Sequence, residues 1–190
     1  DEKFNLVPHL EENLETETTV VKTGEIRDVK TFVPGFSFGD RTRTFLKVQD
    51  GCNYFCAFCT IPLPRGRSRS ATVADTLLEA KKAVAAGAVE IVLTGVNIGD
   101  FGVGHGETLA DLVRGLDDIP GVKRFRISSI EPDLLTDELI DFVAESKKFQ
   151  PHFHIPLQSG SDDVLSAMRR RYRTERFQSR VERIKSKMPE

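Results

Sequence analysis

The sequence predicts an α/β fold in which parallel strands alternate with helices. Four apolar runs have the composition of buried strands, at residues 45–48, 90–94, 125–130 and 153–157. The segments between them carry apolar residues at helical spacing, and strands joined by such helices form parallel sheets with right-handed crossovers. Four such units cannot close an eight-stranded barrel, so the fold is either a doubly wound sheet or part of a barrel.

Local signals place the helices. Thr72 and Asp75 form a capping-box pattern at the start of a helix that we expect to stop at Gly87. Apolar residues recur at helical spacing in four further segments: 109–116, 139–143, 164–170 and 177–184.

Charge divides the chain into two parts. Residues 1–40 hold nine acidic and four basic side chains, whereas residues 41–190 hold twenty and twenty-three. The first part also lacks a strong hydrophobic period. We therefore expect an acidic connector from a missing N-terminal domain at 1–40 and an incomplete main domain at 41–190. The abrupt ends predict a piece of a longer protein.

The composition excludes several classes of protein. The 190 residues are 39% hydrophobic and 29% charged, which is typical of a soluble globular domain. A net charge of −2 excludes a generally polycationic nucleic-acid binder but permits a local basic patch. No apolar run approaches the roughly 18 residues of a membrane helix, and the first residues form no signal peptide. We expect a cytoplasmic protein without a membrane partner.

The chain's 3 cysteines, Cys52, Cys56 and Cys59, lie within one short window. Their odd number and tight spacing argue against a disulfide framework and for a metal or redox site. They follow a predicted strand, at the edge where ligands of parallel α/β folds collect. Three thiolates can hold three irons of a cubane cluster and leave the fourth iron open. The alternative is a structural zinc with His105 as fourth ligand, although no second cysteine pair is present.

This cysteine arrangement resembles the signature of radical S-adenosylmethionine (SAM) enzymes. Residues 45–62 resemble the methylthiotransferase branch of that superfamily, and further matching segments follow in the branch's order: 65–70, 93–97, 128–131 and 154–161. The resemblance covers about residues 41–190 and implies a partial (β/α) barrel of the radical-SAM type, truncated after about four β/α units. Family members also have an N-terminal domain with a second [4Fe-4S] cluster and a C-terminal RNA-binding TRAM domain, both of which we expect to be absent here.

The resemblance implies two cofactors, a [4Fe-4S] cluster on the three cysteines and SAM on its open iron. One electron from the cluster would cleave the sulfonium and release the 5′-deoxyadenosyl radical. Two of the residues concerned have an alternative role without SAM. Phe58 could be an ordinary core aromatic, and Glu131 could be a carboxylate at a helix N-terminus. The resemblance implies these contacts with SAM: Phe58 at the adenine, Asn97 at the amino group, Ser129 and Glu131 at the ribose, and Gln158 in the same cavity.

The cysteine loop itself has few apolar anchors. Residues 51–70 combine the three thiols with two glycines, two prolines and three arginines. We expect ligand bonds to the cluster to supply the order that the loop's own contacts lack.

Arg65, Arg67 and Arg69 alternate with small residues. A strand-like segment would place their guanidinium groups on one side, where they can bind a carboxylate or phosphates. A solvated loop is the alternative.

A second basic segment lies at 161–190, with nine basic and five acidic residues. On a helix Arg169 and Arg173 share a face with Tyr172 close by, which suits phosphate contact followed by base stacking. A charged surface without a ligand is an equal alternative.

The resemblance implies an enzyme, a radical-SAM transferase that adds a methylthio group to carbon 2 of a modified adenosine in tRNA. Residues 52–56, 97–102 and 151–154 are most similar to the branch that acts on threonylcarbamoyladenosine next to the anticodon. Isopentenyladenosine in tRNA, or an aspartate of a ribosomal protein, is the alternative substrate. The implied partners are tRNA and a flavodoxin-like or ferredoxin-like electron donor.

The residues leave two other classes of function open. One is a radical enzyme of a different reaction type, because barrel and cluster are shared by many chemistries. The other is a non-catalytic module that binds RNA and carries an iron-sulfur cluster or zinc.

Overall fold

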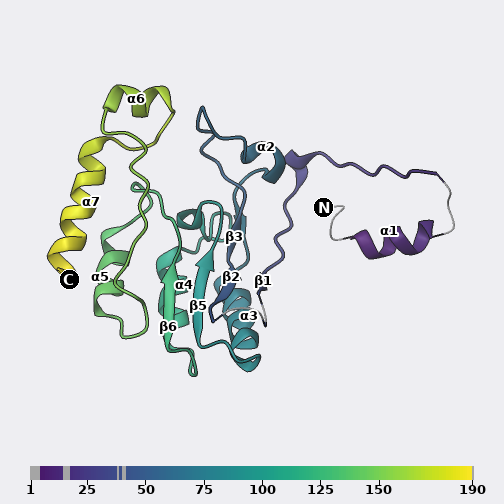
Figure 1. The fold of residues 1–190 in the computed structure, drawn as a ribbon, viewed down its shortest axis with the longest axis horizontal. Helices are drawn as coiled ribbons and strands as arrows, with labels where there is room; N and C mark the ends of the chain where they lie inside the picture. Colours follow the sequence, from purple (N-terminus) through teal and green to yellow (C-terminus); the bar gives the residue numbers. More distant parts are fainter. Residues whose placement is uncertain (1–4, 15–17, 38, 40–41, 190) are drawn as a thin grey trace.

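The computed structural model describes residues 5–14, 18–37, 39 and 42–189. Its main sheet has four strands (Figure 1). Strands β2, β5 and β6 are parallel, and β1 pairs antiparallel with β2 at the edge. The predicted arrangement of parallel strands with helices between them is therefore confirmed. In sheet order the strands are β1 (Gly35–Phe36), β2 (Thr44–Lys47), β5 (Glu90–Thr94) and β6 (Arg124–Ile127).

Buried apolar residues at paired positions on neighbouring strands mark the face of the sheet that the helices cover. Leu46, Leu93 and Ile127 lie side by side on neighbouring strands, and all three are buried. The β2-to-β5 and β5-to-β6 connections run the same way across the sheet, so right-handed crossovers put their helices on one face. The helices that pack in this layer are α3 (Val73–Ala85), α4 (Leu109–Asp117) and α5 (Asp137–Glu145).

A threonine caps each of these three helices. Thr72, Thr108 and Thr136 each accept a hydrogen bond from the backbone N–H three residues later. Gly87, with φ of 100°, follows the end of α3 as the sequence predicts.

The prediction of a fourth strand at 153–157 is wrong. Isolated parallel bridges, Phe125 with Phe149 and Ser129 with His154, take its place beside β6. Prolines explain the interruption, because Pro151 and Pro156 flank the second bridge and neither has an N–H for a ladder. Two further helices follow, α6 (Asp162–Ala167) and α7 (Thr174–Lys187), and α7 packs against α5.

The N-terminal segment has two different parts. Helix α1 (Leu6–Asn13) lies apart from the sheet and buries none of its residues (Figure 1). The 3-10 helix η2 (Ile26–Asp28) contacts α2 (Pro62–Arg65), which belongs to the cysteine loop. The predicted boundary between residues 40 and 41 lies outside the described residues. Over the described part of the chain, no helix has the length and apolar character to cross a membrane.

Candidate active site

The three cysteines lie on a loop that two short strands close at its base. Strand β3 (Gln49–Asp50) pairs antiparallel with β4 (Arg69–Ser70), directly after β2. The backbone N–H of Cys52 donates to the Gly66 carbonyl at 3.1 Å. Cys56 is buried, Cys52 and Cys59 are half-buried, and all three are free thiols. Burial raises the pKa of the Cys52 thiol, so an incoming metal must displace its proton.

Gly51 permits this closure. Its φ is 73°, and a Cβ at this position would lie only 2.0 Å from the Arg67 carbonyl oxygen. A side chain would therefore collide with backbone at the point where the loop leaves β3.

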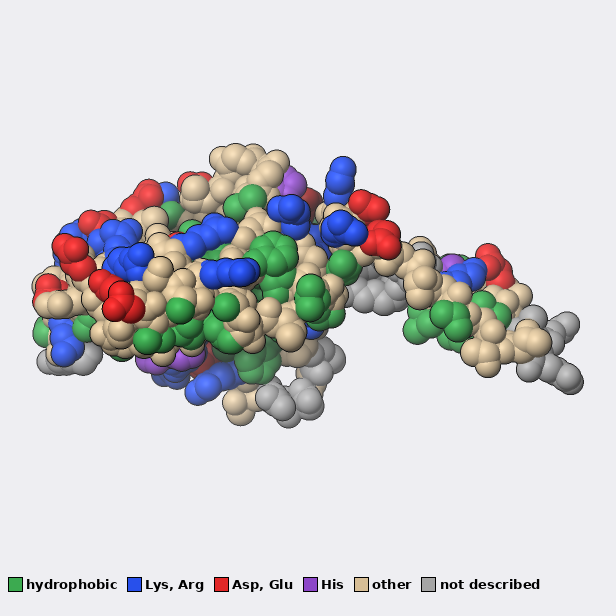
Figure 2. All heavy atoms as spheres, turned by 90° about the horizontal axis from the view of Figure 1, so that it is seen from above, with side chains coloured by type: hydrophobic (Ala, Val, Ile, Leu, Met, Phe, Trp, Pro, Cys, Tyr) green, Lys and Arg blue, Asp and Glu red, His purple; other side chains and the backbone are tan. Residues whose placement is uncertain are grey.

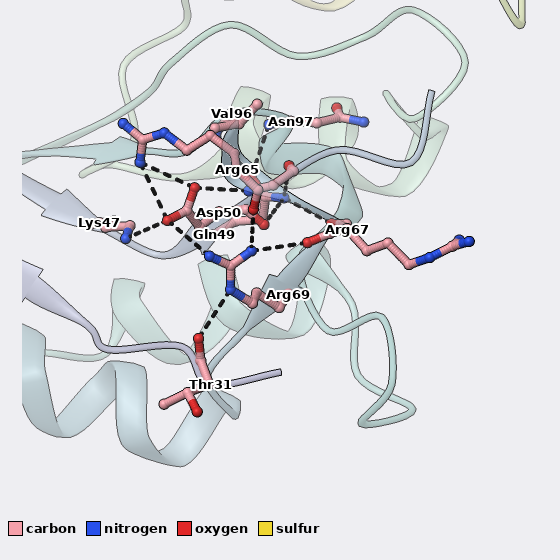
Figure 3. A network of polar contacts seen from close by, with 11 residues as sticks. Thr31, Lys47, Gln49, Asp50, Arg65, Arg67, Arg69, Val96 and Asn97 are labelled. Carbon is pink, nitrogen blue, oxygen red and sulfur yellow. Dashed lines mark hydrogen bonds and ion pairs between the residues drawn. The ribbon is translucent and has the colours of Figure 1, made fainter. Parts of the chain in front are cut away.

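A buried glutamine joins the loop to the carboxyl end of β5. The Gln49 side chain, in a residue with 0% exposure, donates to the carbonyls of Asp50 and Gly51 and to Ser68 Oγ at 2.8–2.9 Å. Its Oε1 accepts from the backbone N–H groups of Val96 and Asn97 at 2.9 and 2.8 Å (Figure 3). One side chain thus spans the start of the loop, its return and the strand end that carries Asn97.

Asn97 presents a free acceptor. Its Nδ2 donates to the Asp100 carboxylate at 3.1 Å, which orients the amide and leaves Oδ1 buried without a partner among the described residues. A buried polar atom of this kind is costly unless a ligand satisfies it. The predicted contact with the amino group of SAM would satisfy it.

A buried arginine joins the loop to the end of β6. Arg170, with its side chain 3% exposed, donates to Sγ of Cys56 at 3.1 Å and pairs with the Glu131 carboxylate. Burial raises the pKa of Glu131, and the guanidinium opposes that rise. The contact places a charged N–H donor against the sulfur of a predicted cluster ligand. The sequence interpretation missed Arg170 because its contacts depend on the fold.

Tyr54 supplies another anchor between the loop and the segment after α6. Its ring lies under the Arg171 guanidinium, 4.1 Å from carbon to centroid, and its hydroxyl donates to the Asp133 carboxylate. Arg171 also donates to the Asn53 carbonyl at 2.6 Å. Burial and the Asp133 hydrogen bond both raise the pKa of Tyr54.

The predicted row of Arg65, Arg67 and Arg69 does not form. A turn after α2 separates them, so Arg65 and Arg69 converge on Asp50 together with Lys47, whereas Arg67 points away (Figure 3). Burial raises the pKa of Asp50, but the Lys47 hydrogen bond and the neighbouring charges outweigh it and lower the pKa below its usual value. Arg65 and Arg69 therefore hold the loop, and the sequence prediction missed these polar anchors.

Arg169 and Arg173 do not share a helix face. Helix α6 ends at Ala167, Arg169 has φ of 58°, and Arg173 is the residue that precedes α7. Tyr172 is buried and its hydroxyl donates to two carbonyls at 2.8 Å, so it is not free to stack on a base.

A basic hollow lies beside the cysteine loop instead. It has a volume of about 670 Å³ and adjoins the start of α7. On the face of the molecule that Figure 2 shows, Lys and Arg side chains are interspersed with acidic ones. The charged residues that line the hollow are Arg170, Arg171, Arg173 and Arg176, with Asp133 and Glu175.

The remaining predicted cofactor contacts lie on the surface. Phe58 is 55% exposed, so it is not a core aromatic. Ser129 is exposed beside His154, and Gln158 is exposed with φ of 63°. Hydrogen bonds connect two of the predicted contacts to the loop, Asn97 through Gln49 and Glu131 through Arg170.

The zinc alternative finds no support. Zinc needs four ligands around one ion, and the described residues contain no group of three or more His, Cys, Asp or Glu side chains placed to hold one. Nε2 of His105 lies instead 3.1 Å from the carbonyl oxygen of Ser70. A cubane cluster does not require its ligands to converge on a single ion, because each thiolate binds a separate iron.

Comparison with known proteins decides the family. The model of the radical SAM superfamily matches residues 46–190. The chain belongs to this superfamily. With it come a [4Fe-4S] cluster and SAM as cofactors, and the free thiols, the orphaned Asn97 Oδ1 and the Arg170 contact fit that pair.

The curated relatives confirm the predicted resemblance to methylthiotransferases. A threonylcarbamoyladenosine tRNA methylthiotransferase of Bacillus subtilis is 47% identical over 83% of this chain and 35% of its own length. One of Thermotoga maritima is 40% identical over 100% of this chain and 44% of its own. A tRNA-2-methylthio-N(6)-dimethylallyladenosine synthase of Alkaliphilus oremlandii is 42% identical over 76% and 31%. The chain therefore spans less than half the length of these relatives.

Solved structures confirm the fold of this radical SAM chain. The radical SAM methyltransferase TsrM of Kitasatospora setae, solved with cobalamin and a [4Fe-4S] cluster, aligns with a TM-score of 0.60. The alignment covers 75% of this chain and 28% of TsrM at 18% identity. This likeness is one of fold.

Proposed function

We propose that this radical SAM chain is the core of a tRNA methylthiotransferase that modifies carbon 2 of threonylcarbamoyladenosine next to the anticodon. The observation that carries the proposal is the joining of the cysteine loop to Asn97 through Gln49 and to Glu131 through Arg170. The choice of threonylcarbamoyladenosine as substrate is supported by the relatives named as threonylcarbamoyladenosine tRNA methylthiotransferases, one of which aligns with the whole chain.

The chain's own residues would hold and orient the cofactors. When bound, the cluster and SAM supply one-electron radical chemistry. Asn97 Oδ1 would accept a hydrogen bond from the amino group of SAM, and the exposed Phe58 ring would pack on its adenine. The remaining assignments are Cys52, Cys56 and Cys59 to the cluster, Ser129 and Glu131 to the ribose, and Gln158 to the same cavity.

The basic hollow supports an RNA substrate. Arg171, Arg173 and Arg176 line it beside the cysteine loop, so they would hold backbone phosphates while the target base reaches the cofactors. Arg67 on the cysteine loop and Arg169, the neighbour of Arg170, are exposed and would extend this contact. A tRNA substrate places the reaction in the cytoplasm.

The complete reaction would need further parts. We assign the second [4Fe-4S] cluster and the TRAM domain to regions of the longer relatives that this chain does not match. A flavodoxin-like or ferredoxin-like protein would supply the electrons.

The test uses the full-length protein with reconstituted cluster, a reductant and SAM carrying a deuterated methyl group. The tRNA comes from a strain that lacks the modification, and its nucleosides are analysed by mass spectrometry. We expect a labelled methylthio group on threonylcarbamoyladenosine. The matched control is Cys56→Ala, which removes a cluster ligand and should abolish iron uptake and product together. A labelled product on dimethylallyladenosine would move the enzyme to the other branch, and no labelled tRNA would refute the proposal.

A further inference from the structure

The Gln49 side chain uses its full capacity for hydrogen bonds. A primary amide has two N–H donors and one acceptor oxygen, and here Nε2 faces three acceptors while Oε1 accepts from two backbone N–H groups. Glutamate would lose the donors, and leucine would leave every partner unsatisfied. A side chain so placed has no simple substitute.

Two glycines make room for this amide. A Cβ on Gly95 would lie 2.9 Å from Gln49 Oε1 and 3.1 Å from its Cβ. Gly51 lies under the backbone of Arg67, as described above, and its carbonyl accepts from Gln49. The backbone therefore approaches Gln49 closely from the β5 end and from the loop.

We infer that Gln49 is a positioning residue that fixes the cofactor-binding end of β5 against the cysteine loop. Its bonds reach Gly51, which precedes Cys52, and the backbone of Asn97. The placement of Asn97 Oδ1 relative to the first cluster ligand therefore depends on one side chain. This inference rests on the proposed function, because it assumes that Asn97 binds SAM.

The physical consequence is a loss of SAM binding that exceeds the loss of iron. The cysteine loop keeps its other anchors when Gln49 is replaced, namely Asp50 and Arg170. The link from the loop to Asn97 breaks in both variants. Leucine removes the acceptor of the Asn97 backbone N–H, whereas glutamate keeps that acceptor but has no donor for the carbonyls of Asp50 and Gly51. A displaced Asn97 Oδ1 would lose its hydrogen bond to the charged amino group of SAM, and one such bond is worth about tenfold or more in affinity.

The experiment compares Gln49→Glu and Gln49→Leu with the wild type in the full-length protein. Gln178→Leu is the matched control, because Gln178 is an exposed glutamine on α7 whose side-chain amide donates to Glu182 on the same helix. Three quantities are measured on each: iron content, the dissociation constant of SAM, and the change that SAM causes in the electron paramagnetic resonance spectrum of the reduced cluster.

We expect both Gln49 variants to retain most of their iron, to bind SAM about tenfold or more weakly, and to lose most of the spectral change. Gly95→Ala keeps Gln49 and adds one methyl group at an exposed site, so it should shift the SAM dissociation constant in the same direction even if the Gln49 variants fold poorly. The control should match the wild type.

Other outcomes separate this inference from the proposed function. Normal SAM affinity in Gln49→Glu, or in Gly95→Ala when both Gln49 variants fail to fold, would assign Gln49 a role in stability alone. The proposed function would then stand without the positioning role. A wild-type protein that takes up no cluster and binds no SAM would overturn both.

Discussion

The guanidinium of Arg170 donates a hydrogen bond to the sulfur of Cys56 across 3.1 Å, although 114 residues separate them in the sequence. The same guanidinium pairs with Glu131. The loop that carries the thiols and the end of β6 are therefore held by one cation. The hydrogen bond also bears on redox chemistry, because N–H groups that face the sulfurs of an iron-sulfur cluster influence its reduction potential.

Replacement of Arg170 by methionine should destabilise the fold by about 3 kcal/mol at neutral pH, because it leaves the half-buried Glu131 carboxylate unpaired. Burial already raises the pKa of Glu131 above 4.5, and loss of the guanidinium removes the contribution that opposes this rise. A raised folded-state pKa gives stability that is present below the unfolded pKa and lost as pH rises through the folded one. The penalty of Arg170→Met should therefore shrink as pH falls through the raised pKa of Glu131, and it should be smallest below pH 4.5.

Denaturant unfolding of wild type and Arg170→Met at neutral and acidic pH measures this effect. The double variant with Glu131→Gln is the control, since it removes the carboxylate and should recover much of the stability at neutral pH. An equal penalty at both pH values would show that lost packing, and not the unpaired charge, is the cause.

Replacement of Gly51 by alanine should open the base of the cysteine loop. The new Cβ would meet the Arg67 carbonyl oxygen at 2.0 Å, and the φ of 73° adds strain for a residue with a side chain. We expect a loss of iron uptake and of about 2 kcal/mol or more in the free energy of unfolding. Iron analysis and denaturant unfolding provide the measurement.

Gly104→Ala is the matched control for this loop, because Gly104 has φ of 95° with nothing within 4 Å of an added Cβ. This variant introduces the strain of a side chain at positive φ but no steric clash. Equal losses in both variants would mean that conformation alone matters and that the close approach of Gly51 to Arg67 does not.

Removal of two arginines from the basic hollow should weaken tRNA binding in a salt-dependent manner. Each phosphate contact adds about one unit to the slope of log affinity against log salt. The double variant Arg173→Ala with Arg176→Ala should therefore flatten that slope by about 2 and lower the affinity at moderate salt. Filter binding across a salt series measures both.

The comparison variant for tRNA binding is Arg114→Ala, which removes an exposed arginine that pairs with Glu138 on the helical side of the sheet. It should leave the slope unchanged. If both variants behave alike, the hollow is an ordinary charged surface.

The sequence by itself determined the strands β2, β5 and β6, the helices between them, and the chemistry of the three thiols. These features depend on neighbours within a few turns of chain: alternation or helical spacing of apolar residues, threonine caps and the C-x3-C-x2-C spacing. The failure at 153–157 has the same local origin, because the apolar run predicts a strand while Pro151 and Pro156 interrupt the ladder.

Only the tertiary structure decided how the site is held together. Arg65 and Arg69 were indistinguishable from phosphate ligands until the fold placed buried Asp50 between them. No sequence pattern distinguishes Arg170 from the arginines on either side of it, or Gln49 from other polar residues at the end of a strand. The partners that join these residues to other parts of the fold lie between 15 and 114 residues away in the chain. Such contacts have no sequence period, because they arise where loops from different strands meet at one edge of a parallel sheet.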